Sequence, residues 1–293
     1  MRIAITGASG LIGSALTESL TNDGHHVLRL VRRQPTSHDE VRWDPKAGDI
    51  DLPGLAGTES IVHLAGAGVG DHRWTDDYKR EIHDSRVLGT QTIARAAAEL
   101  GVASLISGSA IGYYGDRGDE KLTEESTKGY GFLSDVVADW EAAADSARLA
   151  GVRVTYARTG LVVSSEGGAW KRMLPLFKAG VGGRLGSGNQ YWAFISLADE
   201  VKALRFLIDN DSISGPVNLT APEPVTNRTA TEVLASELHR PAFAAVPAFA
   251  LKIALGEFSS DVLGSTRAMP TRLAQANFAW DDPTMHDAVA AII

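Results

Sequence analysis

Three glycines near the start of the chain have the spacing of a phosphate-binding turn: Gly7, Gly10 and Gly13. The apolar run Ile3–Ile5 precedes them, and Leu11 and Ile12 open a segment with helical spacing. Glycines let the backbone approach a pyrophosphate closely, and the free N–H groups at a helix start favour negative charge. Because strand, turn and helix follow in the required order, we expect a dinucleotide site rather than an ordinary tight turn.

Two arginines, Arg32 and Arg33, end the second predicted strand, about 20 residues after the glycine turn. A site that prefers NAD has an acidic residue there, which binds the ribose hydroxyls. From the second predicted strand onward, this chain has no acidic residue until Asp39, and guanidinium groups suit the 2′-phosphate of NADP. The sequence therefore favours NADP as the cofactor, with two solvated surface arginines as the alternative.

Other chemistries lack the residues that they need. The chain has no cysteine, which excludes disulfides, thiolate metal sites and a cysteine nucleophile. The eight histidines show no metal-binding spacing, and no G-x-S-x-G turn indicates acyl hydrolysis. We expect no metal site, and we interpret His72 and His83, near the predicted cleft, as surface histidines.

The elements that position these residues follow from an alternation of strand-like and helix-like segments. The predicted strands are Ile3–Thr6, His26–Val31, Ser60–Ala65, Ser104–Ser107 and Val152–Ala157. The predicted helices are Leu11–Asp23, Asp76–Leu100 and Phe132–Ala150. This order predicts an α/β fold of the Rossmann type, with a doubly wound parallel sheet and a smaller C-terminal lobe.

The alternation loosens after about residue 160, where glycines and then prolines become frequent. We expect residues 1–165 to form the dinucleotide-binding domain, with residues 196–220 returning to it. Residues 166–195 and 221–293 would form a lobe that closes the cleft at the carboxyl ends of the strands. The segment predicted to form a tight loop over that cleft, with two amides for a polar ligand, is Gly186, Ser187, Gly188, Asn189 and Gln190. A plain surface turn is the alternative there.

The composition limits the kinds of partner and the cellular compartment that we expect for the protein. The net charge of −8 over 293 residues, without a block of lysine and arginine, argues against a nucleic-acid partner. No apolar stretch reaches the roughly 18 residues of a membrane-spanning helix. Met1 leads directly into the first predicted strand, which leaves no room for a signal peptide. We expect a cytoplasmic protein.

Several motifs resemble a known family. T-G-A-S-G-L-I-G at 6–13, H-L-A-G at 63–66 and S-A-I-G-Y-Y-G at 109–115 are similar to the extended short-chain dehydrogenase/reductases of the epimerase/dehydratase superfamily. R-W-T at 73–75, G-S-G-N-Q at 186–190 and M-P-T-R-L-A-Q-A-N-F-A-W at 269–280 resemble one atypical subgroup. Members of that subgroup are usually labelled NADP-dependent nucleoside-diphosphate-sugar epimerases, with the substrate generally unassigned.

The resemblance implies further cofactor contacts and an assembly. Backbone atoms of Leu64, Ala65 and Gly66 would lie along the adenosine half of the cofactor. The residues implied on the nicotinamide side or at the cleft are Ser107, Arg158, Val162, Glu81 and Arg86. Apolar sheet core and a solvated helix face are the alternatives for these residues. Related proteins commonly form a homodimer through the helices that follow the third and fourth strands.

The chain departs from the superfamily at the residues that transfer protons. The standard pair is Tyr-x-x-x-Lys, in which the lysine lowers the pKa of the phenol. No tyrosine of this chain has a lysine at that spacing, and alignment on W-E at 140–141 places Leu133 and Val137 at the two positions. Arg86 replaces the active-site asparagine, so only the serine position survives, as Ser109.

Ser109, Tyr113 and Tyr114 are the remaining catalytic candidates, and the two tyrosines can equally be structural aromatic residues. Two functions stay open. The sequence favours an NADP-dependent oxidoreductase or epimerase that acts on a small polar substrate, such as a nucleotide sugar, by non-standard chemistry. The alternative is a non-catalytic NADP(H)-binding sensor or interaction protein.

Overall fold

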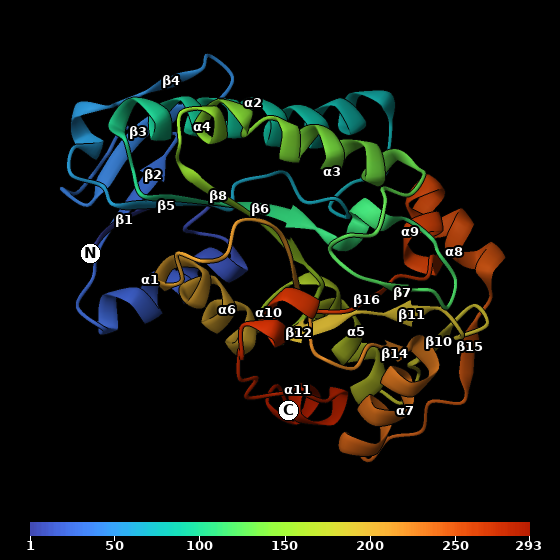
Figure 1. Ribbon diagram of the computed structural model, residues 1–293. Helices are drawn as coiled ribbons and strands as arrows, with labels where there is room; N and C mark the ends of the chain where they lie inside the picture. The colour runs from blue at the N-terminus through green and yellow to red at the C-terminus, as the bar shows by residue number, and fades with distance from the viewer.

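An eight-stranded sheet forms the centre of the computed structural model, which describes residues 1–293 (Figure 1). The strand order is β13-β8-β6-β5-β1-β2-β3-β4, and every neighbouring pair is parallel except β3 and β4. The strands are β1 (Arg2–Thr6), β2 (His26–Val31), β3 (Glu40–Asp44), β4 (Asp49–Ile50), β5 (Ser60–His63), β6 (Ser104–Ala110), β8 (Arg153–Thr159) and β13 (Gly215–Leu219). The predicted parallel α/β fold is confirmed.

Helices cover both faces of this sheet (Figure 1). One face carries α2 (Asp76–Leu100), α3 (Phe132–Ala142) and α4 (Asp145–Leu149), and the other carries α1 (Leu11–Asn22) and α6 (Leu197–Asp209). The single helix predicted over 132–150 is two helices, because the chain bends and turns Ala144 and Ala147 into the core beneath α2. The predicted start of α2 is explained by its cap, since the Thr75 side chain accepts a hydrogen bond from the backbone N–H of Tyr78.

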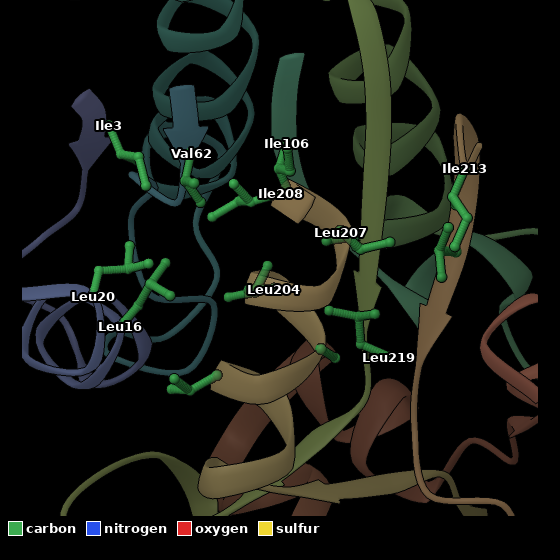
Figure 2. Close-up of a cluster of buried hydrophobic side chains, with 14 of the residues drawn as sticks. Ile3, Leu16, Leu20, Val62, Ile106, Leu204, Leu207, Ile208, Ile213 and Leu219 are labelled. Carbon is green, nitrogen blue, oxygen red and sulfur yellow. The ribbon is translucent and has the colours of Figure 1, made fainter. Parts of the chain in front are cut away.

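The largest apolar cluster joins α1 and α6 to the underside of the sheet (Figure 2). Leu16 of α1 and Leu204 of α6 lie between these helices and the strand residue Val62, and all three side chains are fully buried. Each such leucine contributes about 1.5–3 kcal/mol of burial free energy. This packing holds α6 and the following strand β13 on the dinucleotide side of the molecule, although both come late in the sequence.

A smaller set of elements lies beyond the carboxyl ends of the strands (Figure 1). Its strands form four two-stranded pairs: β9 (Leu161–Val163) with β12 (Phe194–Ser196), β10 (Gly183–Leu185) with β15 (Ala244–Val246), β11 (Tyr191–Trp192) with β14 (Val225–Thr226), and β7 (Lys121–Leu122) with β16 (Arg267–Ala268). Its helices are α5 (Gly168–Lys178), α7 (Asn227–Glu237), α8 (Ala248–Leu255), α9 (Ser259–Leu263), α10 (Thr271–Gln275) and α11 (Met285–Ala290). Trp170, Phe177 and Phe194 are buried in its own apolar cluster.

Short 3-10 turns complete the chain: η1 (Pro53–Leu55), η2 (Ile111–Tyr114) and η3 (Gly256–Phe258). No helix of the structure combines the length and the apolar character that crossing a membrane requires.

Candidate functional site

The glycine turn connects β1 to α1 at the carboxyl edge of the sheet. Gly7 has a φ of +69°, and a Cβ atom there would lie 2.8 Å from the carbonyl carbon of Leu64. A Cβ atom on Gly13 would lie 2.2 Å from the carbonyl oxygen of Gly7, so both positions require glycine. A Cβ atom on Gly10 would meet only that same oxygen, at 3.3 Å, and would otherwise point into open space.

The start of α1 leaves its backbone donors available for an anion. Gly10 is the N-cap residue, it has no side chain that caps the helix, and the first turn contains no acidic residue. The free N–H groups and the helix dipole therefore face the open space beside Gly10. Leu11 and Ile12 form the first turn of this helix.

A buried hydrogen-bond network fixes the neighbouring strand end, where Leu64, Ala65 and Gly66 follow β5. The Thr6 hydroxyl oxygen accepts the N–H groups of Leu64 (3.1 Å) and Ala65 (3.2 Å) and lies 2.7 Å from Nδ1 of His63. Since that oxygen already accepts two hydrogens, its own hydrogen goes to Nδ1, and the ring carries its proton on Nε2. Burial lowers the pKa of His63 to about 3, with the nearby charge of Arg86 adding to the effect, so the ring is neutral. Sequence reasoning missed the roles of Thr6 and His63.

The two arginines after β2 differ in their partners. Arg33 donates to both carboxylate oxygens of Glu40, at 2.7 and 2.6 Å. The hydrogen bonds from Arg33 lower the pKa of Glu40 to about 2, and those same bonds raise the pKa of Arg33. Arg32 is exposed and makes no hydrogen bond or ion pair. Arg29 also lies 3.3 Å from the same carboxylate. Arg33 and Arg29 therefore share one counter-ion, whereas Arg32 has none.

Ser109, at the end of β6, belongs to a buried polar network. Its hydroxyl donates to Oε1 of Glu141 at 2.6 Å, and Arg158 donates to both oxygens of the same carboxylate at 2.7 and 2.8 Å. Burial of Arg158 disfavours its charge, but the hydrogen bonds that it donates to Glu141, the negative charge of Glu141 and the contact with Tyr114 together raise the pKa of Arg158. Because Ser109 donates to Glu141, its oxygen is left as an acceptor for a further group. Glu141 belongs to the W-E motif, yet sequence reasoning used that motif only for alignment.

The two candidate tyrosines occupy different environments. Tyr114 is fully buried, its hydroxyl donates to Oδ1 of Asn218 at 2.8 Å, and Arg158 donates to it at 3.0 Å. Tyr113 is half-buried, and its ring centre lies 3.6 Å from the guanidinium carbon of Arg158. Tyr113 is thus the phenol of this pair that retains contact with solvent.

The helix face that carries the standard tyrosine and lysine is apolar in this protein. Leu133 and Val137 occupy α3, where Leu133 packs beside Gly112 and Val137 is buried. On α2, Glu81 is exposed and makes no hydrogen bond, whereas Arg86 is half-buried. The guanidinium carbon of Arg86 lies 5.1 Å from the ring centre of Trp140 and would lie 3.4 Å from a Cβ atom on Gly66.

The remaining predicted site residues lie in the sheet or in the loop from Gly186 to Gln190. Ser107 is fully buried and its hydroxyl donates to the carbonyl of Gly108, while Val162 is half-buried in β9. In the loop from Gly186 to Gln190, Asn189 is exposed but Gln190 is buried and donates to the carbonyl of Leu185 at 3.0 Å. Of the two amides predicted to face a ligand, the Gln190 amide is therefore engaged within its own loop.

The fold and the turn together define a protein of the Rossmann class related to the atypical extended short-chain dehydrogenase/reductases. The chain belongs to the NAD dependent epimerase/dehydratase family, which matches residues 3–219. Residues 246–292 match a domain of unknown function, DUF1731.

Curated and solved relatives agree with this membership. The epimerase family protein Mb2239 of Mycobacterium bovis is 44% identical over 288 residues, which cover 98% of this chain and 96% of that protein. The crystal structure of human epimerase family protein SDR39U1, solved with NADPH, is 27% identical, has a TM-score of 0.89 and covers 100% of this chain and 99% of that chain. The nucleoside-diphosphate sugar epimerase from Corynebacterium glutamicum is 36% identical, with a TM-score of 0.83 and 99% of this chain covered. This chain spans 57% of the length of that larger protein.

Proposed function

We propose that the protein is an NADP-dependent oxidoreductase or epimerase that acts on a small polar substrate. The observation that carries the cofactor assignment is the contrast between Arg32, which has no partner, and Arg33, which is paired with Glu40. A guanidinium without a partner at the end of the second strand suits a 2′-phosphate. NADPH in the similar human protein supports this choice.

The residues of the turn fit the dinucleotide. The N–H groups after Gly10 would hold the pyrophosphate, and the backbone from Leu64 to Gly66, fixed by Thr6, would line the adenosine half. Bound NADP supplies a hydride acceptor or donor beside the substrate. We assign the segment around Arg158 and Val162 to the nicotinamide side, where Arg158 acts through its bonds to Glu141 rather than by direct contact.

Ser109 is the polar group best placed to orient a substrate oxygen. Glu141 holds the hydroxyl hydrogen of Ser109, so the serine oxygen accepts a hydrogen bond from a substrate hydroxyl. Tyr113 is the second candidate for contact with the substrate, while Tyr114 positions Arg158. A nucleotide sugar is the substrate class that we favour, because the similar protein from Corynebacterium glutamicum carries the name of a nucleoside-diphosphate sugar epimerase.

A non-catalytic NADP(H)-binding sensor is the alternative function. Leu133 and Val137, in place of tyrosine and lysine, favour it, because they remove the usual proton relay. Mass spectrometry of ligands that co-purify with the protein separates the two functions. A second small molecule retained only alongside the nucleotide supports the enzyme, whereas the nucleotide alone supports the sensor.

The cofactor assignment is tested by titrating NADPH and NADH into the wild type, Arg32→Ala and Arg33→Ala. Loss of a charge-assisted bond to phosphate costs about 1.5–3 kcal/mol, which corresponds to roughly 10- to 100-fold weaker binding of NADPH. We expect that loss for Arg32→Ala, with NADH binding unchanged, and a smaller loss for Arg33→Ala. Equal affinity of the wild type for the two nucleotides would contradict the assignment.

A further inference from the structure

Most of the exposed apolar side chains of this protein lie in two segments beyond the sheet, residues 167–198 and 238–256. Nine large apolar side chains are exposed in the whole structure, and five of them belong to these segments: Leu176, Val181, Phe243, Phe249 and Ile253. Phe243 is 94% exposed, Ile253 70% and Phe249 67%. Scattered apolar residues are ordinary on a protein surface, whereas a concentration of this kind marks a contact surface.

Contacts join the two segments into one region made of α5, β15 and α8, which we call the α5–α8 surface. A Cβ atom on Gly180, just after α5, would lie 3.8 Å from the ring of Pro241, and β15 pairs with β10. Arg172 of α5 donates to the carbonyl of Gly70 at 2.7 Å, and the ring of Phe258, just after α8, lies against the same glycine. Both α8 and β15 lie at the end of the molecule opposite β3 and β4 (Figure 1).

The α5–α8 surface is positively charged, although the net charge of the chain is −8. The two segments contain six lysines and arginines and no aspartate or glutamate. Arg172 is paired with Asp71. Glu232 of α7 lines a hollow with Arg240 and Phe243, but the cations outnumber it. The cations of the two segments that form no ion pair are Lys171, Lys178, Arg184, Arg240 and Lys252.

Helix α8 combines the apolar and the positive character on one face. Phe249, Lys252 and Ile253 are spaced i, i+3, i+4 and are all exposed, whereas Leu251 is buried. The stem of a lysine can lie along apolar surface while its ammonium group stays in water. Exposed apolar side chains with a lysine among them are typical of helices that lie in the interface of an anionic membrane.

We propose that the α5–α8 surface binds the headgroup region of an anionic lipid bilayer, with Phe243, Phe249 and Ile253 inserted among the lipids. The five unpaired cations complement the negative headgroups. A second copy of this chain fits less well, since a two-fold axis would set the same cations against one another. A protein partner needs a shape that matches side chains which protrude separately, whereas a fluid lipid interface needs none. No nucleotide takes part, so the inference is independent of the proposed function.

The test is co-sedimentation with sucrose-loaded vesicles, either of phosphatidylcholine alone or of equal parts phosphatidylcholine and phosphatidylglycerol. We expect the wild type to bind the mixed vesicles at least tenfold more tightly than phosphatidylcholine at low salt, and to lose this preference at high salt. The double variant Phe249→Ser with Ile253→Ser should bind the mixed vesicles at least tenfold more weakly than the wild type. Lys252→Gln should bind them about fivefold more weakly, the value of one charge near an anionic surface.

Two control variants alter the same kinds of side chain elsewhere. Leu149→Ser removes a leucine of α4 that is 78% exposed, and Lys46→Gln removes an exposed lysine between β3 and β4. Both should bind the mixed vesicles as the wild type does. Thermal melting followed by circular dichroism checks that each variant is folded, and Lys252→Gln still tests the surface if the double serine variant is not.

Three results would overturn the proposal. The first is a wild type that does not sediment with the mixed vesicles or that binds the two kinds of vesicle equally. The second is unchanged vesicle binding by a folded Phe249→Ser, Ile253→Ser variant. The third is a dimer of the wild type in light scattering that this double variant abolishes, because the surface then belongs to a contact with a second copy.

Discussion

At the scale of a single residue, the carboxylate of Glu141 binds two groups, the hydroxyl of Ser109 and the guanidinium of Arg158. Its side chain is 12% exposed, and that of Arg158 is 3% exposed. We expect Glu141→Gln to destabilise the protein by about 3–5 kcal/mol, because it leaves a buried guanidinium without its counter-ion. Ser109→Ala should cost about 1 kcal/mol, the value of one hydrogen bond.

Urea denaturation followed by circular dichroism measures both effects. Glu99→Gln is the control, since Glu99 forms an exposed ion pair with Arg95 at 3.9 Å and should change the stability by less than about 0.5 kcal/mol. A Glu141→Gln variant as stable as this control would show that the buried ion pair contributes little.

Glu200 makes the stability depend on pH. It is fully buried in α6, one of its carboxyl oxygens accepts a hydrogen bond from Thr159 at 2.7 Å, and the other has no partner. Burial raises the pKa of Glu200 to about 8, whereas an unfolded glutamate has a pKa of about 4.3. Between these values the folded protein keeps a proton that the unfolded chain has lost, so the stability falls as the pH rises, by at most about 1.4 kcal/mol per pH unit.

Glu200→Gln, which stays neutral and keeps an acceptor for Thr159, should flatten this decline between pH 6.5 and 8. His63 does not obscure the result, because it contributes the same pH dependence to the wild type and to Glu200→Gln, and the comparison uses the difference between their slopes. The exposed Glu232→Gln of α7 is the matched control. An unchanged slope in Glu200→Gln, measured by urea denaturation at each pH, would show that Glu200 is ionised in the folded protein.

At the scale of elements, two glycines of the β1–α1 turn should differ in their roles. We expect Gly13 to be required for folding and Gly10 for binding of the nucleotide. Gly13→Ala places a Cβ atom 2.2 Å from the carbonyl oxygen of Gly7, so α1 must move away from β1 and the melting temperature should fall by several degrees. Gly10→Ala meets the same oxygen at 3.3 Å, which a small shift relieves. Its methyl group would occupy the space that we propose for the pyrophosphate.

Gly10→Ala should therefore remain folded but bind NADPH at least tenfold more weakly. The main effect of Gly13→Ala should instead be a lower melting temperature. Thermal melting and NADPH titration of the two variants measure this contrast. A Gly10→Ala protein that binds NADPH as the wild type does would show that the nucleotide does not lie on this turn.

The elements of the sheet were largely predictable, and the partners within the site were not. The alternation of apolar strands and amphipathic helices indicated β1, β2, β5, β6 and β8, because each is a buried run. The strand β3 was missed, since it is short and carries Glu40, Arg42 and Asp44 among its five residues. The pairing of β3 with β2 places Glu40 opposite Arg29, and from there its carboxylate reaches Arg33. Local sequence holds no signal for a contact of that kind.

At the scale of the whole molecule, charge bears on the homodimer that the resemblance implies. The outer faces of α2 and α3 carry exposed carboxylates, among them Asp84 and Asp139, which share a single partner, His83. A two-fold axis brings identical faces together, so these carboxylates would oppose their own copies. We expect a monomer at low ionic strength, with association through this face appearing only when salt screens the charges.

Light scattering after size-exclusion chromatography at 20 and 500 mM salt, values chosen to vary screening widely, measures this behaviour. Asp84→Asn combined with Asp139→Asn should promote association through α2 and α3, whereas Glu232→Gln, on α7, should not. A stable dimer at low salt that is cross-linked through α2 would contradict the expectation.

The ion pair between Arg33 and Glu40 also bears on how the protein evolves. Glu40 on β3 pairs with Arg33 and with Arg29, and it leaves Arg32 as the arginine at the end of β2 without a counter-ion. A substitution of Glu40 would remove the counter-ion of both Arg33 and Arg29 and strengthen the positive potential at the end of β2. If the proposed function holds, the preference for a phosphorylated dinucleotide is exposed to selection at a residue of β3, two strands from the strand that leads into the glycine turn.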